Sequence, residues 1–479
     1  MPRVLIFGGC AHFAGRHLVE LLISNRHADP LVPEFQRIFS LLPRPFATTG
    51  AGEGEEVEEE EEPLEIRVVD KTRPDLAGFP QDIIELFKQN VDVRQGNMWR
   101  NEFIESCFRD DDSAGADGLN GSGPSSTSLT SMSRTSSQNS MNSLTGGNGR
   151  QQSLGPPGRP WDLVVILTAV VKFSQAESYS RESIVGNVKR IVDASEKFGA
   201  RQIVYLSHQY INRSDGTLVD ETTPTINNLP LSEYFIAAEE YMLASERRVP
   251  TVVLRPSPPY GPGDYEGFAP TLITIELCRR YREPMPCYSS PSHFLSLVHV
   301  RDVARAIVHS AIWHAISVGT INKRSTIVHT ASSGSDISNT EVFMLSDGQN
   351  RPCALEASIM SESFQVKTKL LSKVARLVMS TMSPEKVTET LNVSAVQDWV
   401  ELIRTSGCKV SRLSPYVDPD LLRTCYDFSP RVNVDKLRNS GFVWKCPENL
   451  SEYWSEIVDE WKAMNIWPSE DATLPNYNN

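Results

Sequence analysis

Residues 4–18 read VLIFGGCAHFAGRHL, and this stretch decides the fold. The apolar run at its start predicts a buried strand, and the apolar spacing after Gly15 predicts a helix. Between them lies a glycine turn at a helix N-terminus, where backbone amide groups can hold an anion. Gly9 can form the tight turn, and Gly15 can let the helix pack closely on the strand. A purely structural glycine turn is the alternative.

Further apolar runs alternate with helical patterns along the chain. Strands are predicted at Arg37–Leu42, Val91–Gln95, Leu163–Leu167, Gln202–Leu206 and Thr251–Leu254. The β-α-β order predicts an α/β protein with a doubly wound, Rossmann-type parallel sheet that binds ligands beyond the carboxyl ends of its strands. Helical runs around Val366–Met382 and Val396–Arg404, with an amphipathic helix at Leu450–Met464, predict a smaller cap.

These patterns divide the chain into a Rossmann domain at 1–330 and a substrate or cap region at 331–479, which part of 257–295 completes. Two insertions, about 45–63 and 110–160, are rich in Glu or in Ser, Gly and Asn. Such segments bury too little apolar surface to order themselves, so we expect disorder there. They are candidate binding segments for protein partners.

The turn and the following strand suggest the cofactor. A dinucleotide turn usually has a middle glycine, but this chain has His12, whose imidazole could contact a pyrophosphate when protonated. The expected second strand is followed by Arg44 where an NAD enzyme places an acidic residue, which favours NADP(H) over NAD(H). A solvated loop arginine is the alternative reading.

Composition excludes several classes of protein. The 479 residues are 40% hydrophobic and 22% charged, with a net charge of −13, and eight glutamates crowd into residues 53–62. No basic patch offers a surface for nucleic acid. The eight dispersed cysteines form no CxxC pair, which predicts reduced thiols, no structural metal and a cytoplasmic location. We expect neither a signal peptide nor a spanning helix.

Several motifs in order resemble the extended short-chain dehydrogenase/reductase superfamily. They are the turn at Gly9–Gly15, Gly96-Asn97-Met98, Trp161–Ala169, Leu254–Pro256 with Tyr260–Gly263, and Val298–Ala304. Within it the chain looks most like the 3β-hydroxysteroid dehydrogenase and NAD-dependent epimerase/dehydratase branch. The resemblance implies cofactor contacts at Gly9, His12, Phe13, Ala14, Gly15, Arg44, Asn97, Met98, Thr168, Ala169 and Pro256. It also implies a homodimer through helices near Val188 and Tyr241.

The family transfers hydride with a Tyr-x-x-x-Lys pair and an upstream Ser or Thr, and this chain keeps only part of that set. Tyr234 stands in the tyrosine position, but Ala238 replaces the lysine and His208, beside Ser207, holds the hydroxyl position. A phenol has a pKa near 10 and needs a nearby cation to act as a base at neutral pH. Instead, Glu239 and Glu240 follow Ala238 and would oppose phenolate formation if they lay close.

The resemblance thus implies an NAD(P)-binding oxidoreductase acting on a hydroxyl or ketone of a hydrophobic small molecule such as a steroid. In that reading Tyr234 exchanges the proton, and Ser207 or His208 polarises the oxygen. Whether the chain is an enzyme is left open. The alternatives are a non-catalytic dinucleotide-responsive sensor or scaffold, and a protein that has lost the cofactor.

Overall fold

The computed structural model describes residues 2–9, 13–24, 29–40, 64–74, 76, 79–110, 159–167, 175–212, 215–227, 231–244, 247–287, 289–318, 339–370, 372, 381–419, 429–446 and 450–472. The insertion predicted at 45–63 lies outside these ranges, as does nearly all of the one at 110–160. The described residues up to Phe108 and from Pro160 onward form a single unit.

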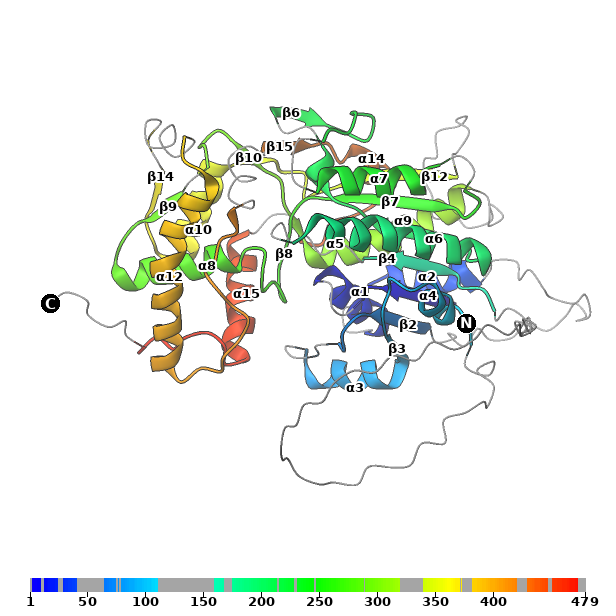
Figure 1. Cartoon of the computed structure of the whole chain (residues 1–479), viewed down its shortest axis with the longest axis horizontal. Coiled ribbons are helices and arrows are strands. Elements are labelled where there is room, and N and C mark those ends of the chain that lie inside the picture. Colours follow the sequence, from blue (N-terminus) through cyan, green and yellow to red (C-terminus); the bar gives the residue numbers. More distant parts are fainter. Residues whose placement is uncertain are drawn as a thin grey trace, which may run out of the picture. The chain divides into compact units, whose positions relative to one another are not determined.

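A parallel sheet of seven strands organises this unit (Figure 1). Its strands are β1 (Arg3–Phe7), β2 (Glu65–Asp70), β3 (Val91–Gln95), β4 (Leu163–Ile166), β5 (Ile203–Leu206), β7 (Thr251–Pro256) and β12 (Thr340–Leu345). The order is β12-β7-β5-β4-β1-β2-β3, and every neighbouring pair is parallel. The predicted doubly wound α/β fold is therefore confirmed, with its topological switch between β1 and β4.

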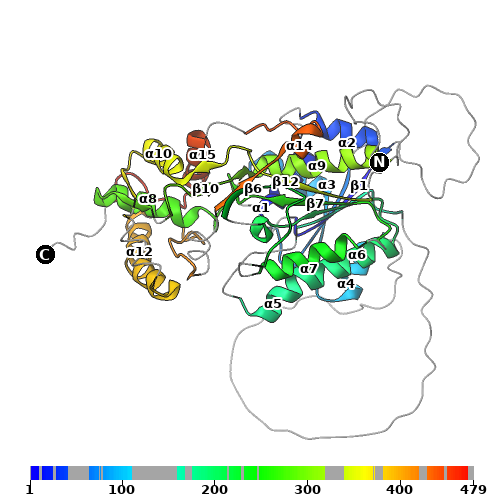
Figure 2. The same ribbon diagram turned by 90° about the horizontal axis from the view of Figure 1, so that it is seen from above.

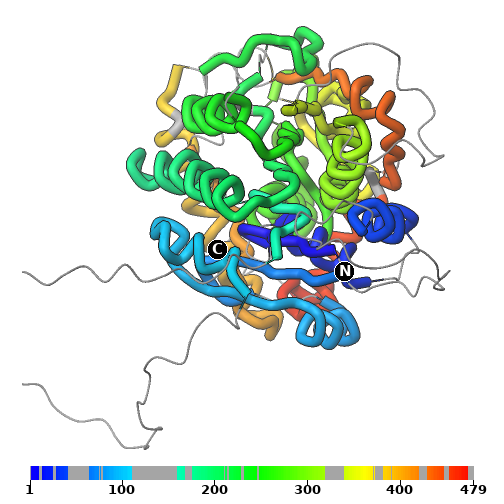
Figure 3. The backbone as a smooth tube through the Cα atoms, turned by 90° about the vertical axis from the view of Figure 1, so that its right-hand side faces the viewer, coloured from blue at the N-terminus to red at the C-terminus, as the bar shows by residue number. Residues whose placement is uncertain are grey.

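Helices cover both faces of the sheet because its strands are apolar on both sides. Val4 and Ile6 face one core and Leu5 and Phe7 the other. Figure 2 shows α4, α6 and α7 on one side and α2, α9 and α14 on the other, and Figure 3 gives a side view. The helices of this part are α1 (Phe13–Ile23), α2 (Leu31–Ser40), α3 (Gln81–Asn90), α4 (Asn101–Cys107), α5 (Glu177–Arg181), α6 (Asn187–Lys197), α7 (Ser232–Met242), α9 (Val300–Ser317) and α14 (Asp435–Asn439).

The second strand was misplaced by the sequence prediction. Residues 37–40 belong to α2, which buries Val32, Phe35, Ile38 and Phe39 at helical spacing. The strand that pairs with β1 is β2, in register from Arg3–Glu65 to Phe7–Val69. A short apolar run fits either a strand or a helix, and the buried residues of this run follow the helical period.

The cap combines segments from distant parts of the sequence. Its helices are α8 (Ala269–Tyr281), α10 (Cys353–Phe364), α12 (Pro384–Ser406) and α15 (Leu450–Ala463), around a core that includes Trp399, Trp454, Trp461 and Trp467. The predicted helix at Val366–Met382 is wrong in part, because Thr368–Leu370 forms β14 and pairs with β9 (Met285–Cys287). The sheet itself draws on residues beyond 330 through β12.

Short strand pairs connect these segments. They are β6 (Asp215–Val219) with β15 (Ser429–Val432), β8 (Pro259–Tyr260) with β11 (Val298–His299), and β10 (Phe294–Leu295) with β13 (Arg351–Pro352). A π-helical turn at Glu182–Gly186 leads into α6, and a 3-10 turn spans Gln209–Ile211. Over the part of the chain that is described, no helix has the length and apolar character to cross a membrane.

Candidate functional site

The carboxyl ends of parallel strands meet at one edge of the sheet, and there the fold collects most of the predicted site residues that it describes. Each follows or ends a different strand. The predicted residues there are Gly9 after β1, Asn97 and Met98 after β3, Ser207 and His208 after β5, and Pro256 at the end of β7. Gly8 and Asp70, which were not predicted, lie at the ends of β1 and β2. Tyr234 lies on α7, which covers one face of the same sheet.

The glycine turn has no room for side chains at two positions. A Cβ atom on Gly15 would lie 2.1 Å from the carbonyl oxygen of Gly9, and one on Gly9 would lie 2.8 Å from Val68 Cγ1. Gly8, with φ of 84°, continues the ladder by donating its N–H to Val69 O at 2.8 Å. Helix α1 therefore begins in close contact with the end of β1, an arrangement that fits a dinucleotide phosphate at the helix N-terminus.

Helix α1 is held in place by contacts with the cap. His17 Nε2 lies 2.7 Å from Pro262 O, and Arg16 Nη2 lies 3.2 Å from Glu460 Oε1. The Arg16 guanidinium also stacks over Phe79 at 4.1 Å. The orientation of the helix that carries the glycine turn is thus fixed by residues from both parts of the molecule.

Asp70 is the residue that sequence reasoning missed. It ends β2 next to the glycine turn, since Phe7 pairs with Val69 in the ladder. A carboxylate at this position is what NAD enzymes use for the ribose hydroxyls. The sequence contains the pattern of this strand, with apolar Ile66, Val68 and Val69 followed by an acid. The pattern was overlooked because it directly follows the glutamate-rich segment. The premise that Arg44 follows the second strand is wrong.

Two aromatic side chains, Trp99 and Tyr179, lie near Lys71, the residue that follows β2. Asn97 Oδ1 accepts the N–H of Trp99 at 3.0 Å, and Met98 packs against the core. The Trp99 ring meets Tyr179 edge-on at 5.2 Å, with Lys71 Nζ within 6 Å of both ring centroids. The carboxyl ends of β2 and β3 therefore offer flat apolar surface next to charged groups, which suits an adenosine.

The other predicted cofactor residues divide into two sets. Ala14 is buried in α1, Phe13 packs against the same core, and Pro256 is buried at the end of β7. His12, Arg44, Thr168 and Ala169 lie outside the described residues.

Tyr234 is surrounded by carboxylates rather than by a cation that would stabilise its phenolate. It lines a pocket of about 380 Å³ together with Glu177, Glu233 and Ser180. Burial and then the carboxylates of Glu233 and Glu177 raise the pKa of Tyr234 to about 12. The guanidinium of Arg181 lies 5.2 Å from the centre of the Tyr234 ring and pairs with Glu177 at 3.4 Å. A phenol in this setting stays protonated at neutral pH.

Ala238, in the position of the family's lysine, is fully buried one turn along α7 from Tyr234. The next residue, Glu239, was expected to oppose phenolate formation, but it forms a buried ion pair with Arg255, whose Nη2 lies 2.6 Å from Glu239 Oε2. The carboxylates that act on Tyr234 are thus Glu177 and Glu233. Buried charges are tolerated when paired in this way.

Ser207 and His208 are placed differently from each other. Ser207 is buried at the end of β5, next to the hydroxyl of Tyr205 two residues earlier. Burial and the Glu239 carboxylate raise the pKa of the Tyr205 phenol, and a hydrogen bond with Ser207 offsets part of this rise. His208 is half-buried, with its ring 5.5 Å from Phe235. The end of β5 therefore carries a buried hydroxyl and, next to it, a half-buried imidazole.

Metals and subunit contacts receive little support from the described residues. No group of three His, Cys, Asp or Glu side chains in those ranges could hold a metal ion. Val188 is fully buried, and Tyr241 donates to Asp193 Oδ1 at 2.5 Å beneath the Arg247 guanidinium. The homodimer through these helices stays a prediction.

Comparisons with known proteins agree with the fold. Residues 159–318 match the sequence profile of the NAD dependent epimerase/dehydratase family. A UDP-N-acetylglucosamine 4-epimerase from Methanobrevibacter ruminantium M1, in complex with UDP-N-acetylmuramic acid, superposes with a TM-score of 0.54 at 12% identity, covering 96% of this chain and 98% of the other. A dTDP-glucose 4,6-dehydratase from Streptomyces venezuelae with NAD bound has the same TM-score and identity, with 96% and 97% covered.

A third structure, the UDP-glucose 4-epimerase of Thermotoga maritima with UDP-glucose, has a TM-score of 0.51 at 14% identity, with 96% of this chain and 99% of that chain covered. No curated protein sequence matches the chain. The predicted resemblance to the NAD-dependent epimerase/dehydratase branch is confirmed over residues 159–318, and the solved structures show that the chain shares their fold. These neighbours act on nucleotide sugars, so the steroid stays a prediction from resemblance alone.

Proposed function

We propose, from the match of residues 159–318 to an NAD-dependent family, that this protein binds NAD(H) along the carboxyl edge of its sheet and responds to it without hydride turnover of its own. The glycine turn at Gly9 and Gly15 supports the phosphate end of this proposal, because neither position has room for a side chain. Asp70 supports NAD(H) over NADP(H), because its carboxylate would repel a 2′-phosphate. Because residues 37–40 belong to α2, Arg44 does not follow the second strand of the sheet and gives no support for NADP(H).

The proposal that the protein does not catalyse hydride transfer rests on the residues that surround Tyr234. A tyrosine base needs a cation close to its oxygen, but Glu177 and Glu233 raise the pKa of this phenol and Ala238 supplies no charge. Ser207 is buried and shares a hydrogen bond with the Tyr205 hydroxyl. His208 can donate a hydrogen bond, but an imidazole in place of the family's hydroxyl changes the group that would face a substrate. The chain then functions as a dinucleotide-responsive sensor or scaffold.

A rewired oxidoreductase is the second candidate, favoured by the pocket of about 380 Å³ in which Tyr234 lies. A protonated phenol can donate a proton to a carbonyl oxygen during reduction, even where it cannot act as a base. In this reading His208 polarises the oxygen, and the substrate enters beside Glu177 and Glu233. Two carboxylates in the lining disfavour the anionic nucleotide sugars on which the structural neighbours act.

The role of Asp70 can be tested by comparing NADH with NADPH. We expect the wild-type protein to bind NADH at least about 10-fold more tightly than NADPH, a difference of about 1.4 kcal/mol. In Asp70→Asn that preference should disappear, because the substitution removes the charge and keeps the size. Calorimetric titration of both proteins with both nucleotides gives the four affinities.

A matched control for this experiment is Asp92→Asn on the neighbouring strand β3. Asp92 pairs with Arg67 and Arg94 and lies away from the carboxyl end of its strand, so its substitution should leave the nucleotide preference unchanged. Tighter binding of NADPH by the wild type, or an unchanged preference in Asp70→Asn, would contradict the assignment of the ribose position to Asp70.

A further inference from the structure

A groove of about 490 Å³ runs along the outer side of α12 in the cap, the amber helix at the left of Figure 1. One wall is the helix itself and the other is the chain just before Pro419. The inner face of α12 buries Trp399 and Leu402 in the cap core. Its outer face exposes Val393 and Val400, with 57% and 59% of their surfaces accessible. The helix is thus apolar on two sides.

The groove is preformed, because side chains of α12 hold its second wall in place. The Asn392 side chain donates to Val417 O at 2.9 Å and accepts the N–H of the same residue at 2.8 Å. Trp399 Nε1 donates to Leu413 O at 3.1 Å. A binding surface that is already ordered loses little entropy when a partner docks.

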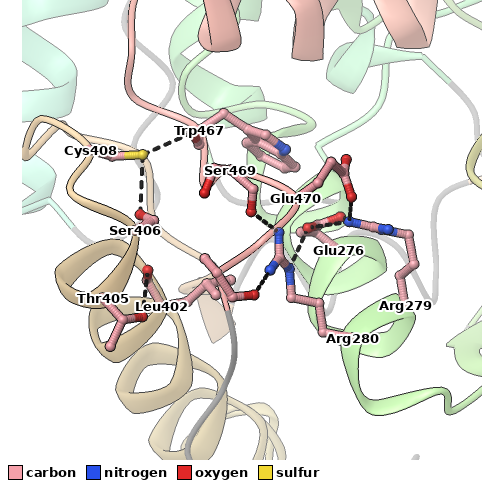
Figure 4. A network of polar contacts seen from close by, with 11 residues as sticks. Glu276, Arg279, Arg280, Leu402, Thr405, Ser406, Cys408, Trp467, Ser469 and Glu470 are labelled. Atoms are coloured by element: carbon pink, nitrogen blue, oxygen red, sulfur yellow. Dashed lines mark hydrogen bonds and ion pairs between the residues drawn. The ribbon is translucent and has the colours of Figure 1, made fainter.

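The end of α12 is anchored as well, as Figure 4 shows. Cys408 Sγ donates to Trp467 O at 2.8 Å, just after the helix ends. The segment that follows Trp467 is tied to α8, where Arg280 Nη2 donates to Ser469 O and Arg279 pairs with Glu470, each at 2.8 Å. The groove therefore lies on a helix fixed at its far end by a polar network.

The lining combines apolar side chains with negative charge. Val393, Val396, Tyr416 and Pro419 supply apolar surface, and 51% of Tyr416 is exposed. Glu385 and Glu389 are the charged residues of the lining, which contains no lysine, arginine or histidine. Negative charge in the lining repels nucleic acid and anionic lipid, and the Glu389 carboxylate attracts a cationic partner.

We propose that this groove docks a partner protein through a short segment in which an aliphatic or aromatic side chain is flanked by lysine or arginine. The apolar residue contacts Val393, Val396 and Tyr416, and the basic residue pairs with Glu389. The volume suits a few side chains rather than a folded domain. This inference is independent of the proposed cofactor, since the groove uses none of the residues at the carboxyl edge of the sheet.

Panning a random peptide phage library on the full chain tests the proposal. We expect the enriched sequences to share a basic residue next to an apolar one. A synthetic peptide of the commonest sequence should bind the wild type and lose about 10-fold or more in affinity with Val393→Asp. Glu389→Gln should weaken binding and reduce its dependence on salt.

Val410→Asp is the matched control, because Val410 is 92% exposed and lies outside the groove lining. It should bind the peptide as the wild type does, and thermal unfolding of each variant shows that it is folded. Equal binding to the wild type and to Val393→Asp overturns the proposal, as does the absence of an enriched sequence. Dimerisation of the wild type that Val393→Asp abolishes, seen by sedimentation, also overturns it, because the occupant would then be a second copy.

Discussion

Replacement of Gly15 by alanine is expected to abolish NADH binding. The added Cβ would meet the Gly9 carbonyl oxygen at 2.1 Å and its carbon at 2.6 Å, and neither backbone atom can rotate away. The turn must open, which should lower NADH affinity by more than about 100-fold, or about 2.7 kcal/mol. We also expect the free energy of unfolding to fall by about 3 kcal/mol, as in overpacked cores. Calorimetry and denaturant unfolding measure the two effects.

Two further variants make this result interpretable. Gly407→Ala forces alanine into a positive φ of 69° but meets no atom within 4 Å, so it should cost about 1 kcal/mol of stability and leave NADH binding unchanged. Gly9→Ala meets side chains rather than backbone, with Val68 Cγ1 at 2.8 Å and Ile6 Cγ2 at 3.2 Å, so it should weaken binding less than Gly15→Ala, by about 10-fold. If a folded Gly15→Ala protein binds NADH within a few-fold of the wild type, the phosphate turn is wrongly assigned.

Replacement of Ala238 by lysine is expected to produce the largest change at Tyr234. An ammonium group one helical turn away should lower the pKa of the phenol from about 12 by 1 to 3 units, roughly 10- to 1,000-fold in its ionisation constant. Ultraviolet difference titration after a rapid pH jump measures ionisation before the chain unfolds. Subtracting the signal of Tyr234→Phe isolates this tyrosine from the other twelve.

Ala238→Met is the control for this substitution, because methionine has an unbranched side chain without the charge. Its Tyr234 should titrate as in the wild type, while Glu177→Gln with Glu233→Gln should lower the pKa in part by removing two negative charges. A wild-type Tyr234 that already ionises below pH 9 would show that another cation, such as Arg181, activates it. The rewired oxidoreductase would then be the better account.

The elements that were predictable from sequence were those with a strong local pattern. Val4–Phe7 and the glycines after it identified the sheet and its binding edge, because an apolar strand followed by a glycine turn has few other structural meanings. Tyr234 and Ala238 could be placed because their spacing follows the family motif. These predictions depended on short stretches in which every residue fits the same structural pattern.

The residues that were missed depend on contacts across the chain. Residues 37–40 look like a strand until Phe35 and Phe39 are seen to pack on one helical face, and the pairing of β2 with β1 then identifies Asp70 as the end of the second strand. Glu177 is 57 positions before Tyr234, so its effect on the phenol is invisible in sequence. The groove on α12 likewise needs the pairing of Asn392 with Val417.

Calorimetric titration of the wild-type chain with NADH tests the central proposal most directly. We predict saturable binding of one NADH per chain, and a rise of about 2.7 kcal/mol in the free energy of unfolding at 100 times the dissociation constant. An absence of saturable heat with NADH, from protein shown to be folded, would contradict the proposal that this chain is a dinucleotide-binding protein.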